Sequence, residues 1–159
     1  MFENIYTKLD QYVNKVRILI LNLRGANIGK NVYSFGKFKV ISANKLSIGD
    51  NSTINENVFF NCRNYINIGK DCHLSPNVQL HTGKLILNTI KRKHTSAPIN
   101  IRDNVWISTG TVVSAGITIG KNSVIGANSV VVNDVDSNSF YAGNPAKKIK
   151  DIEIENITR

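Results

Sequence analysis

The sequence is poor in cysteine and aromatic residues, and it contains no long apolar run. Of its 159 residues, two are Cys, one is Trp, five are Tyr and six are Phe. Two cysteines are too few for a disulfide framework, and a chain with no secretory signal is expected to keep them reduced in the cytoplasm. The longest apolar stretch, residues 18–21, is far shorter than the roughly 20 residues that cross a bilayer. A core must therefore be built mainly from Ile, Val and Leu.

Positive charge, in contrast, is abundant. The net charge is +9, and basic residues cluster at 91–93 and again at 147–150. Such runs bind anionic molecules such as lipids or polyanionic small molecules, or they form solvated surface. Nucleic-acid binding is not expected, because the basic residues lack interleaved aromatics and no recognised binding motif occurs.

A six-residue repeat dominates the middle of the chain. The period matches neither a helix of 3.6 residues per turn nor an alternating strand. It is explained if the chain turns a corner every six residues, so that three short strands form one triangular coil of about 18 residues. The small residue after each apolar one, often Gly, is expected to tolerate the backbone angles of the corner. The repeated apolar residues are Ile48, Ile54, Phe60, Ile68, Leu74, Leu80, Ile101, Ile107, Val113, Ile119, Ile125 and Val131.

The spacing of the coils is interrupted once. Coils start clearly at residues 46, 66, 99 and 117, and more weakly at 28. The separations of the clear starts are 20, 33 and 18 residues. The long gap predicts a loop extruded after Leu80, over roughly residues 82–98, and solenoids often carry such insertions at their functional face.

The two ends of the chain differ from the repeat. Apolar residues at spacings of three and four predict an amphipathic helix ending near Gly25. This helix is expected either to cap the first coil or to touch a membrane from the side. A turn at 142–146 leads into a basic tail, so the parts are a helix (1–25), a repeat domain (26–142) and a tail (143–159). Four basic residues of the helix would face lipid headgroups: Lys8, Lys15, Arg17 and Arg24.

Three motifs resemble the hexapeptide-repeat acyltransferases: DNVWI at 103–107, IGKNSVIGANSVV at 119–131 and AGNPA at 142–146. The likeness covers about residues 26–150 and is strongest to galactoside, maltose and bacterial polysaccharide O-acetyltransferases. It implies an all-β fold, a left-handed parallel β-helix with an N-terminal helix, the extruded loop of 82–98 and a short tail. It also implies a homotrimer with active sites between subunits, acetyl-CoA as acyl donor, a histidine as general base and no metal.

The catalytic histidine of this family follows a Thr-Gly-like pair. Here the pair at 82–83 is followed by Lys84 and Leu85, so no histidine stands at the usual position. Two candidates remain, His81 at the root of the loop and His94 at its far end. Imidazole suits the role because its ordinary pKa lies near 6.5. If neither is the base, the chain is an inactive relative or a binding protein.

The third histidine raises a different possibility. The γ-type carbonic anhydrases use the same solenoid with three histidines on zinc. That family places two of them five residues apart, whereas His73, His81 and His94 are separated by eight and thirteen residues. A zinc site is therefore not expected, and surface packing is the expected role of His73.

The resemblance assigns further residues to the site. Asn77 matches an asparagine that hydrogen-bonds the acceptor, although a corner role would explain it equally well, and Trp106 matches an aromatic residue that flanks the site. The remaining matches concern coenzyme A: small positions near the pantetheine arm and basic positions that meet the phosphates. These are Ser108, Ala127, Lys147 and Lys150.

The sequence therefore favours an acetyl-CoA-dependent O-acetyltransferase acting on a sugar hydroxyl. The expected setting is bacterial polysaccharide or lipopolysaccharide biosynthesis, in the cytoplasm and peripheral to the inner face of the membrane. An N-acyltransferase on an amino sugar and a serine acetyltransferase share these features. A non-catalytic trimeric scaffold or binding protein is the alternative from another class.

Overall fold

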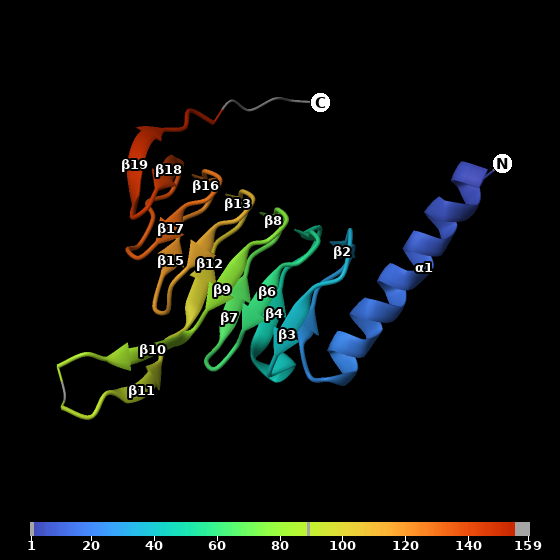
Figure 1. The fold of residues 1–159 in the computed structure, drawn as a ribbon. Helices are drawn as coiled ribbons and strands as arrows, with labels where there is room; N and C mark the ends of the chain where they lie inside the picture. The colour runs from blue at the N-terminus through green and yellow to red at the C-terminus, as the bar shows by residue number, and fades with distance from the viewer. Residues whose placement is uncertain (1, 89, 155–159) are drawn as a thin grey trace.

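The computed structural model describes residues 2–88 and 90–154, which form one helix and a parallel β-solenoid (Figure 1). Helix α1 (Phe2–Leu23) lies at one end, and the coils stack away from it. Three parallel faces run along the solenoid, and each is a sheet made of one strand per coil. This architecture confirms the predicted left-handed parallel β-helix with an N-terminal helix and one extruded segment.

The strands are short, and each pairs with the equivalent strands of the neighbouring coils. The first face contains β1 (Asn27–Ile28), β4 (Leu46–Ile48), β7 (Ile66–Ile68), β12 (Ile99–Ile101) and β15 (Thr118–Ile119). The second contains β2 (Tyr33–Ser34), β5 (Thr53–Ile54), β8 (His73–Leu74), β13 (Trp106–Ile107), β16 (Val124–Ile125), β18 (Ser139–Gly143) and β19 (Ala146–Asp151). The third contains β3 (Lys39–Ile41), β6 (Phe59–Asn61), β9 (Gln79–His81), β14 (Val112–Val113) and β17 (Val130–Val131). A 3-10 turn, η1 (Ala43–Lys45), follows β3.

The core is a set of aliphatic columns inside the three faces. Every residue of the predicted six-residue repeat is buried. The strand register stacks aliphatic residues on aliphatic residues of the next coil. For example, Ile54 pairs with Leu74, and Ile107 pairs with Ile125. Burial of each such side chain contributes about 1.5–3 kcal/mol relative to exposure. The stacked repeat, rather than any one strand of two or three residues, therefore holds the solenoid together.

Both cysteines lie inside these columns as free thiols. Burial raises the pKa of Cys62 and of Cys72 to about 11. The Cys72 thiol also donates to the backbone oxygen of Arg102 at 3.1 Å. Both residues therefore behave as small core side chains rather than as reactive thiols.

The corners differ from the sequence expectation. The left-handed backbone angles belong mostly to asparagines, whose side chains tolerate this region and form a ladder between coils. Asn31 donates to Asn51 at 3.1 Å, and Asn122 donates to Asn138 at 2.7 Å. A Cβ on Gly49 would lie 2.6 Å from the backbone of Gly69 in the next coil. The reason predicted for the repeat glycines was therefore wrong, because close approach between coils, not backbone angle, excludes a side chain.

At the N-terminal end, α1 covers the open edge of the first coil. The Asn14 side chain is buried and accepts from the Ser34 backbone N–H at 2.7 Å. Leu21 is buried against the coil. The helix ends two residues before Gly25, which adopts a left-handed angle of φ 87° and closes it. This end agrees with the prediction that the helix stops near Gly25.

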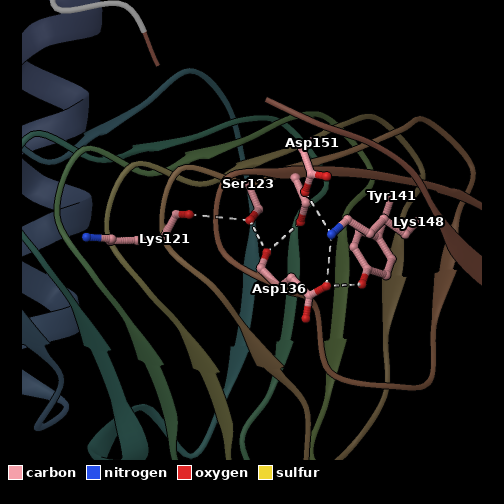
Figure 2. A network of polar contacts seen from close by, with 7 residues as sticks. Lys121, Ser123, Asp136, Tyr141, Lys148 and Asp151 are labelled. Atoms are coloured by element: carbon pink, nitrogen blue, oxygen red, sulfur yellow. Dashed lines mark hydrogen bonds and ion pairs between the residues drawn. The ribbon is translucent and has the colours of Figure 1, made fainter. Parts of the chain in front are cut away.

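At the C-terminal end, the second face continues beyond Val131, where the sequence placed the last repeat. Strand β18 adds in parallel to β16, and β19 folds back on it in antiparallel fashion. Figure 2 shows the polar network that fastens this hairpin. The Asp136 carboxylate accepts from Tyr141 and from Lys148, both at 3.2 Å, while its backbone oxygen accepts from Ser123 at 2.6 Å.

Candidate functional site

The extruded segment is a β-hairpin that leaves the solenoid between β9 and β12. Strand β10 (Gly83–Ile86) pairs antiparallel with β11 (Lys93–Ser96). Its two ends are held together at the solenoid edge. Thr82 is fully buried, donates through Oγ1 to the Asn61 oxygen at 2.7 Å, and accepts from the Ala97 N–H at 3.0 Å. The loop predicted at 82–98 is thus confirmed, and its strand pairing was not predicted.

A cleft of about 260 Å³ lies at the root of the hairpin. Its wall combines the end of β6 with both hairpin strands. Arg63 covers Gly83, since a Cβ there would lie 2.9 Å from the Arg63 Cδ. The lining residues are Asn61, Arg63, Gly83, Lys84, Leu85 and His94. Three of them carry basic or titratable groups, so the cleft suits an anionic or polar ligand.

His94 lies in this cleft directly opposite Leu85. Residues paired across an antiparallel ladder have Cβ atoms about 4.5–5.5 Å apart and point to the same side. The imidazole of His94 therefore stands beside Leu85, one of the two positions at which the resemblance places a catalytic histidine, while Lys84, the other position, pairs with Thr95. The sequence shows no histidine there, and the fold supplies one from the opposite strand.

His81 ends β9 and pairs with Asn61, which lines the same cleft. Its Nε2 lies 3.0 Å from Gln79 Oε1, and its ring stands edge-on to Phe59 at 5.5 Å between centroids. Because the amide oxygen accepts, Nε2 donates and Nδ1 keeps the lone pair that a base requires. Burial lowers the pKa of His81, which favours the neutral form. His81 itself does not line the cleft.

His73 stands apart on the exposed second face. Its Nδ1 lies 2.8 Å from the Thr53 hydroxyl in the neighbouring coil, and it pairs with Trp106 on the other side. This position fits the surface-packing role expected from the sequence. Within residues 2–88 and 90–154, no group of three His, Cys, Asp or Glu side chains is placed to hold a metal ion.

The predicted acceptor residues lie elsewhere. Asn77 occupies the corner between the second and third faces with φ 63°, and its N–H donates to the Glu56 oxygen at 3.0 Å. This geometry fits the corner role. Trp106 is 52% exposed on the second face and donates through Nε1 to Ser75 at 2.9 Å. Strand β9 separates Asn77 from the root of the hairpin, and neither Asn77 nor Trp106 lines the hairpin cleft.

The predicted coenzyme A residues fall on the same side as Trp106. Ser108 follows β13, and Ala127 follows β16, so both lie at the corner between the second and third faces. Lys147 and Lys150 are exposed on β19, which extends the second face. Lys148, between them, is already held by Asp136 at 3.2 Å and Asp151 at 2.7 Å.

Two cleft residues were missed by sequence reasoning, Asn61 and Arg63. They follow the Phe60 repeat in the coil before the insertion, where nothing in the local sequence sets them apart. The stacking of the coils could have identified them. A loop that leaves one coil at Thr82 emerges beside the equivalent corner of the preceding coil, which is where Asn61 and Arg63 lie. Asn61 indeed pairs with His81.

Sequence comparison finds relatives along most of the chain. The profile of the family described as bacterial transferase hexapeptide (six repeats) matches residues 98–133. A Dictyostelium discoideum protein provisionally named an acetyltransferase is 39% identical over 130 residues, covering 80% of this chain and 68% of that protein. An Escherichia coli K12 protein provisionally named a colanic acid biosynthesis acetyltransferase is 31% identical over 147 residues, covering 92% of this chain and 81% of that protein.

Solved structures share this fold over most of the chain. A maltose O-acetyltransferase from Clostridium difficile 630 superposes with a TM-score of 0.83 at 33% identity, over 93% of this chain and 84% of that one. A hexapeptide-repeat acetyltransferase from Vibrio cholerae, complexed with acetyl coenzyme A, gives a TM-score of 0.83 at 28% identity, over 93% of this chain and 85% of that one.

Proposed function

The chain belongs to the hexapeptide-repeat acyltransferases, and from that membership we propose that it transfers an acetyl group from acetyl-CoA to a sugar hydroxyl. Acetyl-CoA is the donor bound in the Vibrio cholerae structure that shares this fold. The sugar acceptor is supported by the likeness to a maltose O-acetyltransferase. The observation that carries the proposal is the imidazole of His94 in the hairpin cleft, which is also lined by Lys84 and Leu85, the two positions expected for the family's histidine.

The proposed chemistry needs one general base and a set of hydrogen-bond donors for the oxyanion. A neutral imidazole takes the proton of the acceptor hydroxyl while the oxygen attacks the thioester carbonyl. Backbone N–H groups stabilise the oxyanion that forms on the former carbonyl oxygen. The carbon–sulfur bond then breaks, the thiolate of coenzyme A leaves, and the imidazolium returns its proton to that sulfur. The products are the acetyl ester and free coenzyme A.

Two imidazoles remain candidates for the base. His94 is favoured by its place in the cleft and by its pairing with Leu85. His81 is favoured by its lowered pKa and by the hydrogen bond to Gln79, which fixes its ring. Since Asn61 both pairs with His81 and lines the cleft, either ring is close to the same space.

We further propose a homotrimer with sites between subunits. The hairpin cleft and the Trp106 side lie on different edges of one chain, so a single subunit does not assemble the whole predicted set. A neighbouring subunit would bring its own second face to the cleft. In that arrangement Asn77 and Trp106 would contact the acceptor, and coenzyme A would meet the four residues predicted for it: Ser108, Ala127, Lys147 and Lys150.

The proposed setting is bacterial polysaccharide or lipopolysaccharide assembly, in the cytoplasm and close to the membrane. The name of the Escherichia coli relative, which refers to colanic acid biosynthesis, supports it. No helix in the described part of the chain is long and apolar enough to cross a membrane. Acetyl transfer to the amine of an amino sugar or to serine is the second candidate, because the same base and donor would serve it.

The test compares three single variants, His94→Ala, His81→Ala and His73→Ala. Release of coenzyme A is measured with maltose, a galactoside, glucosamine and serine as acceptors. Loss of a general base lowers turnover about 10²–10⁴-fold, and we expect this loss for His94→Ala or His81→Ala, with His73→Ala unchanged. Full activity of both loop-root variants would refute the base assignment. Wild-type protein that consumes no acetyl-CoA with any acceptor would instead favour the non-catalytic scaffold.

A further inference from the structure

Helix α1 presents two apolar faces, of which the solenoid covers only one. The covered side carries Asn14, Ile18 and Leu21 against the first coil. The opposite side is exposed, with Leu23 at 78% and Tyr12 at 67% accessibility. At 3.6 residues per turn its members fall on one side of the helix, and we name them the outer stripe: Leu9, Tyr12, Val16, Leu19, Ile20 and Leu23.

Basic residues flank the outer stripe on both sides. Lys15 is exposed along one border, beside Leu19 in the groove between α1 and the first coil. Arg17 lies on the other border, and Arg24, directly after the end of the helix, lines the same cleft as Arg17 and Ile20. Arg24 donates to the Val40 oxygen at 3.0 Å and Arg17 to the Ser34 hydroxyl at 3.4 Å, which fixes both guanidinium groups near the coil.

The second border also contains a small cleft. Its volume is about 260 Å³, and Arg17, Arg24 and Lys37 meet there beside Ile20. Among the described residues, no Asp or Glu lines this cleft or the groove beside Lys15. Three cations around one opening, next to exposed apolar side chains, match the headgroup and the acyl region of an anionic lipid.

We infer that the outer stripe is a docking surface for an anionic lipid bilayer. The helix lies in the plane of the interface with its apolar side immersed, and the cleft between Arg17, Arg24 and Lys37 receives lipid phosphates. An apolar stripe bordered on both sides by Lys and Arg is the pattern of helices that lie on membranes. Cations on both borders add electrostatic attraction to anionic headgroups, which a purely apolar protein interface would not require.

The two sequence interpretations of α1 are thereby assigned to its two sides. One side caps the first coil, and the other docks to lipid. The docked side also leaves the rest of the molecule free, because α1 lies at one end of the solenoid and β19 at the other (Figure 1). Docking depends on no catalytic residue and therefore stands or falls separately from acetyl transfer.

The experiment is flotation of the full chain with phosphatidylcholine vesicles, with and without phosphatidylglycerol. We expect wild-type protein to float only with the anionic vesicles and to be released by salt, since ions screen exposed charges. The double variant Leu19→Glu with Leu23→Glu should bind at least about thirtyfold more weakly, because two apolar side chains leave the lipid. Arg24→Gln should weaken binding about fivefold, the share of one basic residue near an anionic surface.

The matched control is Val132→Glu with Ile154→Glu, two exposed apolar residues far along the chain from α1 that undergo the same change of charge. Its binding should equal that of wild type. Thermal unfolding of both double variants is measured in parallel, and equal midpoints show that the helix still caps the coil. Absence of wild-type flotation would overturn the inference, as would equal loss in the control. A change in subunit number of the stripe variant, with no vesicle binding by wild type, would show that a second copy covers this surface.

Discussion

The coils and the hairpin of this chain are built on opposite principles. In the coils, each apolar side chain is fully enclosed by equivalent residues above and below, as Ile107 is between Leu74 and Ile125. In the hairpin, the tip residues Leu87 and Ile90 are exposed, and the strands pair only with each other. The coils repeat one packing arrangement, whereas the hairpin interrupts that repeat. The difference separates stability, which resides in the coils, from chemistry, which we place in the hairpin.

The largest effect should come from removing the hairpin. Replacing residues 84–95 by an Asn-Gly turn joins Gly83 to Ser96, which already pair, through a two-residue turn that suits a hairpin. Acetyl-CoA turnover should fall about 10²–10⁴-fold if His94, which this change removes, is the general base, since His81 is retained. The thermal unfolding midpoint should stay close to that of wild type. Retained turnover would place the base outside the hairpin.

Truncation of a large side chain should have unequal consequences in the two regions. Phe60 is fully buried, so Phe60→Ala should lower the free energy of unfolding by about 3–5 kcal/mol. Leu87→Ala, at an exposed tip position, should change it by less than about 0.5 kcal/mol. Denaturant unfolding of both variants measures the contrast. Similar losses would mean that the hairpin contributes to the packed core.

Glycine substitutions should show the same difference between coils and hairpin, with smaller losses of stability. Gly49→Ala brings a Cβ to 2.6 Å from backbone atoms of the next coil, which cannot move aside, and should cost about 1–3 kcal/mol. Gly83→Ala meets only the flexible Arg63 side chain at 2.9 Å, so stability should change little. Unfolding midpoints of the two variants test this directly, and an equally large loss for Gly83→Ala would show that Arg63 is rigidly held.

The smallest effect concerns the pH dependence of stability at His81. Burial lowers its pKa in the folded protein below the ordinary 6.5, so the unfolded chain binds the proton more readily. Its contribution is present above pH 6.5 and is lost as the pH falls below that value towards the folded pKa. His81→Gln should therefore flatten the acid side of a plot of unfolding midpoint against pH. An unchanged plot would mean that the ring is fully hydrated.

Much of the fold could be predicted because the repeat encodes it redundantly. Ile54, Leu74 and Ile107 occupy equivalent positions of the repeat, so the position of one predicts the position of the next in the same column. The helix was also predicted, since its apolar spacing and Gly25 indicate its extent, but its packed side, which carries Leu21, was not predicted. The role of the repeat glycines was predicted wrongly, because a glycine beside a corner can serve either a special backbone angle or a close approach between coils. Only the distance to the next coil distinguishes these two roles.

The candidate site was predicted less well because it depends on which residues pair across the hairpin rather than on their order in the sequence. Nothing in the sequence places His94 opposite Leu85, since that register is set by the hairpin. Trp106 and His81 belong to different coils and lie on different faces. In the homotrimer that we propose, these residues would converge only through a second subunit, and such convergence leaves no spacing signal within one chain.

The clamp at Thr82 has a consequence for how such proteins diversify. The inserted segment begins and ends where Thr82 and Ala97 are already hydrogen-bonded, and the ladders β7–β12 and β9–β14 run past it without a break. A segment of any length whose ends meet at one strand spacing, about 4.8 Å, can therefore be exchanged there without disturbing the register. In the function that we propose, exchange of this segment would change the acceptor preference while the solenoid is retained.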